Sequence, residues 1–368
     1  MKRSLLICWL FAAVVCARGS VDVNADGNVR FCYHSLFAKK VIVNIAGKHV
    51  EMEKADRGEF SAELSGLQPD MYTYTYTIDG VETLDPDNLL VVRDCNRRYS
   101  YLIVGGEGAD LYKTSDVEHG IVEQSWYLTD DGRQHAMTVY LPPSYKTGKG
   151  YYPVLYLLHG TGGDCLAWRD LGRVAQIADN LISQGRSKEL IIIMPNCNYW
   201  QQESPEKSGI EESWNMMGTT MRMMDGKFEE NFGNLVNQVE KQYRVLTRKN
   251  SRAIAGLSRG GYFAYHISHF YNMMFDYVGL FSATYRTDGK SRVYRNIEKD
   301  LVRQFQTPPA LYYISIGKDD FLYDENKAFR KMLDEKGIGY IYNESAGGHE
   351  WSNWRRYLVD FLPRLFKN

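Results

Sequence analysis

The chain has 368 residues, enough for one large domain or two ordinary ones. Its composition, 44% hydrophobic and 24% charged, is typical of a folded globular protein. The formal net charge of −1, without a long run of one sign, argues against the basic face that a nucleic-acid-binding protein needs to neutralise phosphates, so we expect no nucleic-acid partner.

Residues 1–20 have the outline of a secretory signal peptide. Lys2 and Arg3 precede an apolar run that ends in small residues. We expect cleavage after Ala17 and export to the periplasm or the extracellular space. The alternative is a lipid anchor at Cys16, although the residue before it is a poor match to the small residue expected there. Beyond this segment no stretch has the apolar length that a transmembrane span requires.

Export would permit disulfide bonds. Four cysteines follow the signal segment: Cys32, Cys95, Cys165 and Cys197. One plausible pair joins Cys32 to Cys95, and the alternative is four free thiols, because pairing cannot be read from spacing alone.

Residues 21–105 are predicted to form a small all-β sandwich. The stretch MYTYTYTIDGVETLDP alternates strictly and then turns at Asp79-Gly80, which is a strong hairpin signal. Alternation places threonines on one face and tyrosines on the other, namely Tyr72, Tyr74 and Tyr76. Because the threonine face suits solvent, we expect the tyrosines to lie in the core rather than to stack on sugar rings.

A Gly-rich linker, assigned to 106–116, leads into a segment of different character, 117–368. Near-continuous apolar runs here predict strands buried on both faces: 152–160, 189–196, 252–258, 277–283 and 311–317. Between them lie helical candidates near 171–185, 228–243, 260–274, 324–336 and 354–366. This alternation predicts an α/β domain with a mostly parallel sheet flanked by helices. Functional residues then collect at the carboxyl ends of the strands.

The stretch AIAGLSRGG places Ser258 directly after a predicted strand and before a predicted helix. Small residues two before and two after it, Gly256 and Gly260, allow the sharp turn of a nucleophile elbow. Such a turn projects the hydroxyl beside the unpaired N–H groups of a helix N-terminus. In this context the serine is predicted to be a nucleophile, and the alternative is a turn without chemistry.

A serine hydroxyl needs a base, and in α/β-hydrolases an acid and then a histidine follow the serine in the chain. Asp320 follows a predicted strand and is the expected acid, with Asp319 as the alternative. His349 follows a later strand-like run and is the expected base. The other histidines downstream of the serine, His266 and His269, fall inside a predicted helix and are expected to be structural or surface residues.

Acyl transfer also needs donors for the developing oxyanion. We expect the backbone N–H of Arg259 to be one donor and that of Thr161, in the loop LLHGTGGD, to be the other, with Gly162 in reserve. His159 is expected to brace this loop by a hydrogen bond. The chemistry requires neither a cofactor nor a metal, and we expect none.

These motifs resemble the esterase D type of α/β-hydrolase, and within it carbohydrate esterase family 1, which includes feruloyl and acetyl xylan esterases. The resemblance covers nearly all of the chain after the signal segment and is carried by the blocks at 119–127, 140–145, 157–164, 243–264, 316–329 and 345–363. The stretch 74–88 resembles the end of an immunoglobulin-like early-set domain. The resemblance implies the same nucleophile, acid and base. Relatives often have Met where this chain has Arg259, whose guanidinium is expected to shape the pocket or to contact a polar substrate.

Substrate-binding residues are harder to predict. Four tryptophans are candidates for lining an aromatic or sugar-binding cleft: Trp168, Trp200, Trp214 and Trp351. Two of them lie in the irregular stretch 196–228, which also holds a methionine cluster. Long insertions at the carboxyl end of a strand often form lids or substrate walls. The alternative is that these side chains simply pack the insertion onto the core.

The sequence therefore predicts an exported serine carboxylic-ester hydrolase that removes feruloyl groups, or secondly acetyl groups, from plant xylan or arabinoxylan. Its expected partners are the corresponding feruloylated or acetylated oligosaccharides. A siderophore esterase of the enterochelin type has a similar two-domain order, but its work is cytoplasmic. An inactive hydrolase scaffold that only binds glycan is the remaining alternative.

Overall fold

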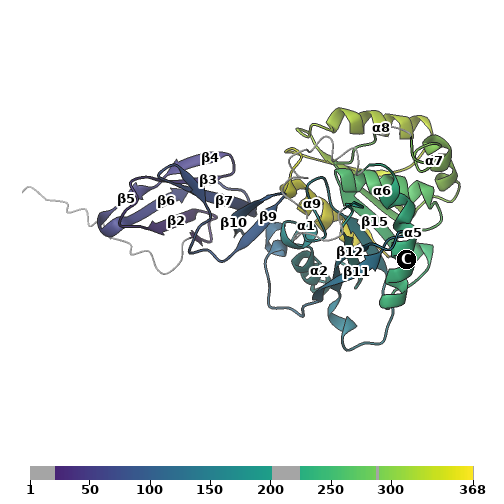
Figure 1. Ribbon diagram of the computed structural model, residues 1–368, viewed down its shortest axis with the longest axis horizontal. Helices are drawn as coiled ribbons and strands as arrows, with labels where there is room; N and C mark the ends of the chain where they lie inside the picture. Colours follow the sequence, from purple (N-terminus) through teal and green to yellow (C-terminus); the bar gives the residue numbers. More distant parts are fainter. Residues whose placement is uncertain (1–20, 201–223, 287–289, 368) are drawn as a thin grey trace, which may run out of the picture. The chain divides into compact units, whose positions relative to one another are not determined.

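The computed structural model describes residues 21–200, 224–286 and 290–367 (Figure 1). The chain divides into two compact units. In the described part, the smaller unit comprises 21–68, 72–91 and 99–104, and the larger comprises 69–71, 92–98 and 105–367. The predicted signal segment, with Cys16, lies outside the described residues.

Residues 21–104, most of which belong to the smaller unit, form two antiparallel sheets. One has the order β1 (Val21–Val23), β2 (Val29–His34), β6 (Glu59–Leu64) and β5 (Glu53–Lys54). The other has the order β4 (Lys48–Glu51), β3 (Val41–Ile45), β7 (Asp70–Ile78), β10 (Arg97–Val104) and β9 (Val91–Asp94), with β8 (Val81–Thr83) also paired to β7. A 3-10 turn, η1 (Asp56–Gly58), precedes β6.

Apolar side chains from both sheets form the core of this unit. They include Phe31 and Phe60 from the first sheet and Val43 from the second. Tyr74 and Tyr76 are fully buried among them, as the alternation predicted, because their rings face the opposite sheet.

The threonine face is less open to solvent than expected. Thr75 is buried and accepts a hydrogen bond from the Asn44 amide at 3.2 Å. Its hydroxyl in turn donates to Glu82 at 2.9 Å. Polar neighbours on the adjacent strands therefore cover this threonine.

The predicted disulfide between Cys32 and Cys95 is wrong. Cys95 is a free thiol, as are Cys165 and Cys197, whereas Cys32 is disulfide-bonded. Cys95 lies in the stretch 92–98, which belongs to the larger unit, whereas the stretches before and after it, 72–91 and 99–104, belong to the smaller one.

An eight-stranded mixed sheet forms the centre of the larger unit. Its order is β11 (Ile121–Leu128), β12 (Gln134–Leu141), β14 (Ile191–Pro195), β13 (Val154–Leu158), β15 (Arg252–Leu257), β16 (Tyr277–Phe281), β17 (Leu311–Gly317) and β18 (Ile341–Ser345). β12 is antiparallel to both of its neighbours, and every pairing from β14 to β18 is parallel. The five predicted apolar runs coincide with β13 to β17, because each of these strands is buried along most of its length.

The described residues of this unit include the helices α1 (Ala167–Asp170), α2 (Val174–Ser183), α5 (Lys227–Gln242), α6 (Arg259–Phe270), α7 (Ile297–Gln306), α8 (Tyr323–Glu335) and α9 (Trp351–Phe361). Short 3-10 turns are η2 (Ala109–Tyr112), η3 (Pro143–Tyr145), η4 (Lys249–Ser251) and η5 (Leu362–Arg364). The sequence predicted α2, α5, α6, α8 and α9, but neither the short α1 nor α7.

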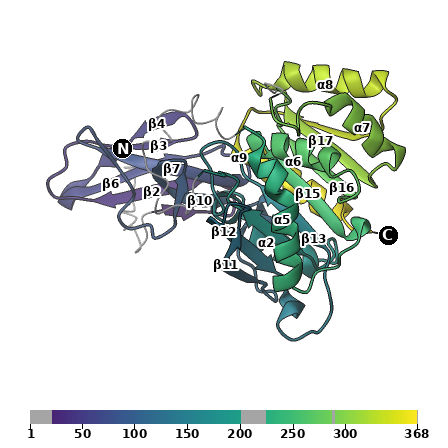
Figure 2. The ribbon, with the colours of Figure 1, turned by 45° about the vertical axis from the view of Figure 1, so that its right-hand side comes forward.

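Helices cover both faces of the sheet. Helix α6 packs on β15 and β16 with α5 beside it, and Figure 2 shows α5 and α6 together over the sheet. On β16, Leu280 joins the core that contains side chains of α5 and α6. The next residue, Phe281, packs instead against Phe361 of α9 at a ring-centroid distance of 5.5 Å. Consecutive residues of one strand thus face different helices.

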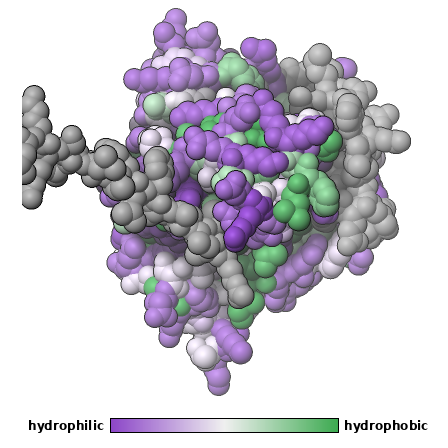
Figure 3. Space-filling view, turned by 90° about the vertical axis from the view of Figure 1, so that its left-hand side faces the viewer, coloured by the Kyte–Doolittle hydropathy of each residue, from purple (hydrophilic) through white to green (hydrophobic). Residues whose placement is uncertain are grey.

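Within the described ranges, no helix has the combination of length and apolar character needed to cross a membrane. On the face drawn in Figure 3, hydrophilic side chains predominate and hydrophobic ones lie between them in small groups.

Candidate active site

The turn from β15 to α6 forces Ser258 into an unusual backbone conformation. Its φ is 54°, in the left-handed region, and its ψ is −120°. A Cβ atom at Gly256 would lie 2.3 Å from the carbonyl oxygen of Gly260. A Cβ atom at Gly260 would lie 2.4 Å from the carbonyl oxygen of Leu158. Only glycine fits at either position, which is the steric requirement of a nucleophile elbow.

The structure brings the predicted serine, histidine and acid together. Nε2 of His349 lies 2.9 Å from Oγ of Ser258. Nδ1 of the same ring lies 3.0 and 2.9 Å from the two carboxylate oxygens of Asp320. With the proton on Nδ1, the ring donates to the carboxylate and accepts from the serine hydroxyl. This is the arrangement that lets an imidazole act as a base toward a hydroxyl.

Asp320 is held as a carboxylate in a buried position. Burial by itself would raise its pKa, but hydrogen bonds from His349 and from the backbone N–H of Leu322 outweigh burial and lower the pKa below its usual value. The residue is 4% exposed, whereas the neighbouring Asp319 is exposed to solvent. Of the two aspartates considered from the sequence, Asp320 is the one in contact with the imidazole.

The imidazole lies between two aromatic rings. Trp354 meets it edge-on at 5.0 Å between centroids, and Phe321 lies against it at 4.5 Å. Neither aromatic residue was among the sequence-based candidates. Their contacts with His349 are not visible in a sequence pattern. For Phe321, its position directly after the predicted acid could have indicated that it lies near the site.

The loop after β13 approaches the serine closely. A Cβ atom at Gly160 would lie 3.2 Å from Cβ of Ser258. The backbone N–H of Thr161, the expected oxyanion donor, gives no hydrogen bond to any residue in the described part of the chain. The reserve candidate, Gly162, has a φ of +77°, which favours glycine there.

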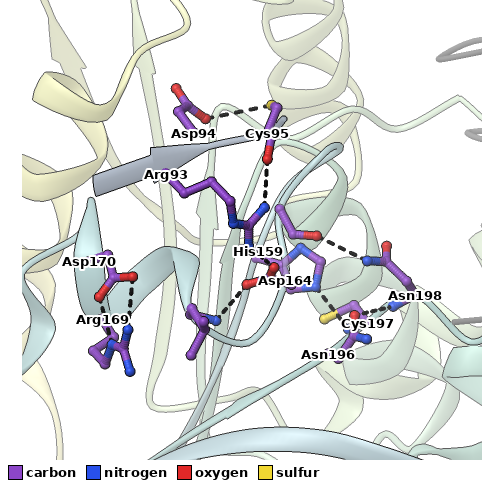
Figure 4. A network of polar contacts seen from close by, with 12 residues as sticks. Arg93, Asp94, Cys95, His159, Asp164, Arg169, Asp170, Asn196, Cys197 and Asn198 are labelled. Atoms are coloured by element: carbon purple, nitrogen blue, oxygen red, sulfur yellow. Dashed lines mark hydrogen bonds and ion pairs between the residues drawn. The ribbon is translucent and has the colours of Figure 1, made fainter. Parts of the chain in front are cut away.

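His159 braces this loop, as predicted (Figure 4). Its Nδ1–H donates to the carbonyl oxygen of Gly160 at 2.9 Å, and its Nε2 accepts from the backbone N–H of Cys197 at 2.9 Å. Burial lowers the pKa of His159 to about 3. The ring is therefore neutral in the folded protein and supplies one donor and one acceptor to the loop.

The guanidinium of Arg259 points into the protein. The residue is 1% exposed, and its Nη2 donates to Asn198 and, at 3.4 Å, to the carbonyl oxygen of Gly160. The Asn198 amide donates onward to the carbonyl oxygen of Gly163 at 3.0 Å. Burial lowers the pKa of Arg259 to about 10. The expectation that this side chain contacts a polar substrate is not supported, because the side chain is buried and its hydrogen bonds hold the loop after β13.

A second support comes from residues 92–98, which belong to the larger unit. Arg93 forms an ion pair with the buried carboxylate of Asp164 at the end of the loop (Figure 4). A Cβ atom at Gly162 would lie 2.5 Å from Sγ of Cys95, so the two residues are in close contact. Sequence analysis missed these contacts, because Arg93 and Asp164 are 71 residues apart.

The tryptophan candidates have different environments. Trp168 is 1% exposed and its indole N–H donates to the carbonyl oxygen of Leu158 at 3.0 Å, so a substrate contact is not supported. Trp351 is partly exposed and packs edge-on against Trp168 at 5.4 Å. Trp200 is 47% exposed and its indole donates to Asp225 at 3.0 Å. Trp214 and most of the methionine cluster lie outside the described residues.

Among the residues described, no group of three or more His, Cys, Asp or Glu side chains is arranged to hold a metal ion. The helix residues His266 and His269 are fully buried, in line with a structural role.

The mixed sheet covered by helices on both faces, with a serine at the strand-to-helix turn, defines an α/β-hydrolase. Residues 131–365 match the family model described as "Putative esterase", so the chain belongs to this esterase family.

Related proteins carry esterase names. An endo-1,4-beta-xylanase/feruloyl esterase from Xylanibacter ruminicola is 29% identical over 361 residues, which are 94% of this chain and 46% of that protein. An acetyl esterase from Caldicellulosiruptor saccharolyticus is 25% identical over 246 residues, covering 58% of this chain and 83% of that protein. The chain thus spans about half the length of the first of these relatives.

Solved structures have the same fold. A ferulic acid esterase, 27% identical, superposes with a TM-score of 0.53 over 67% of this chain and 97% of that one. The enterobactin esterase of Shigella flexneri, 14% identical, has a TM-score of 0.61 over 91% of this chain and 92% of that one. At 14% identity the second likeness shows the fold alone.

Proposed function

We propose that this protein is a serine carboxylic-ester hydrolase that releases feruloyl groups from plant cell-wall xylan or arabinoxylan through an acyl-enzyme. The observation that carries the proposal is the continuous contact from Ser258 through His349 to Asp320, with distances of 2.9 Å on each side of the ring. The position of the serine at a helix N-terminus beside a glycine-rich loop supports the same reaction.

In this mechanism Ser258 Oγ attacks the ester carbonyl carbon while its proton passes to Nε2 of His349. The carbonyl oxygen becomes an oxyanion that accepts hydrogen bonds from the backbone N–H groups of Thr161 and Arg259. His349 then gives the proton to the alcohol oxygen, which leaves as the free hydroxyl of the sugar. Asp320 stays ionised, orients the ring and stabilises the imidazolium.

The second half of the reaction repeats these steps with water. His349 takes a proton from a water molecule that attacks the acyl-enzyme carbonyl carbon. The tetrahedral intermediate uses the same two N–H donors and collapses with return of the proton to Ser258. The products are the free carboxylic acid and the regenerated serine.

Feruloyl is the first choice of acyl group because relatives of this chain carry feruloyl esterase names. Acetyl is the second choice, since one relative is named an acetyl esterase. The charged and apolar pattern of residues 1–20 supports export. The proposed division is 21–105 for a β-domain, 106–116 for a linker and 117–368 for the catalytic domain, whereas the larger compact unit also includes 69–71, 92–98 and 105–116.

The test is product analysis with a nucleophile variant. The purified protein is incubated with arabinoxylan oligosaccharides that carry both esters, and released ferulate and acetate are quantified by chromatography. We expect ferulate as the main product from the wild type. Ser258→Ala should lower turnover by about 10⁵- to 10⁶-fold with an unchanged thermal unfolding midpoint.

Ser183→Ala, at an exposed serine of α2, is the matched control and should retain full activity. Undiminished turnover by Ser258→Ala would sink the serine mechanism. Acetate as the main wild-type product would replace feruloyl by acetyl in the proposal.

A further inference from the structure

Phe321 is an exposed aromatic residue in contact with the proposed general base. Of the phenylalanines in the described part of the chain, only Phe321 and Phe37 are classed as exposed, at 77% and 90%. Single exposed apolar side chains are common on protein surfaces, so exposure alone implies nothing. What distinguishes Phe321 is its ring, which lies 4.5 Å from the imidazole of His349 with 48° between the planes.

The turn that carries Phe321 is fixed by the site itself. Asp320, the residue before Phe321, contacts the imidazole of His349 at 2.9 Å. The backbone N–H of Leu322, the residue after Phe321, donates to the Asp320 carboxylate, also at 2.9 Å. The backbone N–H of Asp320 donates to the carbonyl oxygen of Gly317 at 3.2 Å. The phenyl ring therefore sits on an anchored backbone and needs no loop ordering before it meets a ligand.

The two aromatic neighbours of the imidazole are not equivalent. Trp354 is 6% exposed and belongs to the core side of His349. Phe321 is exposed, so among the described residues it is the aromatic ring in contact with the imidazole that a bound molecule can reach.

The chemistry decides which half of the ester lies there. When the tetrahedral intermediate collapses, Nε2 of His349 must give its proton to the alcohol oxygen, so the alcohol half lies within hydrogen-bond reach of this ring. The acyl half remains bonded to Ser258 Oγ, with its oxygen at the N–H donors of Thr161 and Arg259. An exposed ring in contact with the imidazole is therefore a candidate neighbour of the alcohol half.

We propose that Phe321 is a specificity-determining residue that binds the sugar carrying the ester. The proposal rests on the proposed esterase function and names the part of the substrate that this residue contacts. A sugar ring presents an apolar C–H face, and packing that face on a phenyl ring removes apolar surface of both from water. The contact discriminates a carbohydrate ester from a simple alkyl ester of the same acid.

The experiment compares two esters with one acyl group: a feruloylated arabinoxylan oligosaccharide and methyl ferulate. In Phe321→Ala we expect kcat/KM for the oligosaccharide to fall about tenfold, mainly through a higher KM, as for loss of one aromatic contact. Methyl ferulate should stay within about twofold of the wild-type value, since methanol is too small to reach the ring. Phe321→Trp, which keeps an aromatic face, should restore the oligosaccharide value.

Phe37→Ala, at the other exposed phenylalanine, is the matched control and should leave both substrates unchanged. An equal loss on both esters in Phe321→Ala would overturn the proposal, because the ring would then act by positioning His349. Unchanged kinetics on both would overturn it as well. If the wild-type protein hydrolyses neither ester, the proposed esterase function is wrong, and this inference falls with it. If the wild-type protein is active but Phe321→Ala shows no selective loss on the oligosaccharide, only the role of Phe321 is wrong.

Discussion

At the scale of single residues, the carboxylate of Asp320 determines which nitrogen of His349 carries the proton. The carboxylate can only accept, so it keeps the proton on Nδ1 and leaves Nε2 free to accept from Ser258. An asparagine in its place presents an amide that can donate to Nδ1, which favours the wrong tautomer with little change in shape.

Asp320→Asn is therefore expected to lower kcat by about 10³- to 10⁴-fold, with a thermal unfolding midpoint close to that of the wild type. Steady-state kinetics on methyl ferulate, together with calorimetry, measure both quantities. The matched control is Asp319→Asn, one residue earlier and exposed, which should retain nearly full activity. If the Asp319 variant lost more activity than the Asp320 variant, the assignment of the acid would be wrong.

The sequence predicted Ser258 and His349 because each follows a strand-like run with small residues around it. It left Asp319 open beside Asp320, since adjacent loop residues differ only in the direction of their side chains. The supports of the glycine-rich loop, Asn198 and Arg93, were out of reach. Their roles come from contacts between segments distant in sequence, 61 residues for the pair of Asn198 with Arg259.

At the scale of secondary-structure elements, the strand-to-helix turn depends on backbone clearance. A Cβ atom at Gly256 would meet the Gly260 carbonyl oxygen at 2.3 Å, and this oxygen belongs to the first turn of α6. Backbone atoms cannot move aside as a flexible side chain does, so α6 and Ser258 would shift together.

Gly256→Ala is expected to destabilise the protein by about 3 kcal/mol or more. We also expect kcat to fall by about 100-fold or more, since a displacement near 1 Å costs that much in rate. Urea unfolding and ester kinetics give the two values. Gly339→Ala, at a glycine with open space around its would-be Cβ atom, should change neither by much. Wild-type stability and rate in Gly256→Ala would contradict this steric account of the turn.

The elements themselves were predicted to different degrees. Strands β13 to β17 were found because a strand buried on both faces is a continuous apolar run. Helix α7 was missed, although Ile297, Leu301 and Phe305 recur at the spacing of one helical face. Its remaining residues are mostly polar, and only a periodicity count would have separated it from a loop.

At the scale of the whole molecule, four histidines in the larger unit are buried: His135, His159, His266 and His269. Burial lowers the pKa of His135 to about 4 and that of His159 and His269 to about 3, and it places the pKa of His266 well below the usual 6.5. All four are neutral in the folded protein at neutral pH.

Glu229 changes the free energy of unfolding with pH in the direction opposite to the four histidines. It is fully buried, its Oε1 accepts from the Tyr294 hydroxyl at 2.6 Å, and burial raises its pKa to about 8. Between pH 4.5 and about 8 the folded protein binds one proton here that the unfolded chain lacks, so this group lowers the free energy of unfolding as pH rises.

The balance of these groups predicts lability toward acid. Above pH 6.5 the histidines are neutral in both states and contribute nothing to the pH dependence. Below it the unfolded chain binds up to four protons that the folded protein excludes, so the free energy of unfolding falls by about 1.4 kcal/mol per histidine and pH unit. Glu229 offsets one of the four. We therefore expect the urea midpoint of the larger unit to fall steeply from pH 6.5 to 5.

The test is a variant of one buried histidine. In His135→Phe, whose ring fits between Tyr127 and Tyr199, the slope of the unfolding free energy against pH should fall by about one proton. The control His34→Gln, at an exposed histidine, should leave that slope unchanged. A midpoint that stays constant across this range, or a slope unchanged by His135→Phe, would mean that these rings do not remain neutral in the fold.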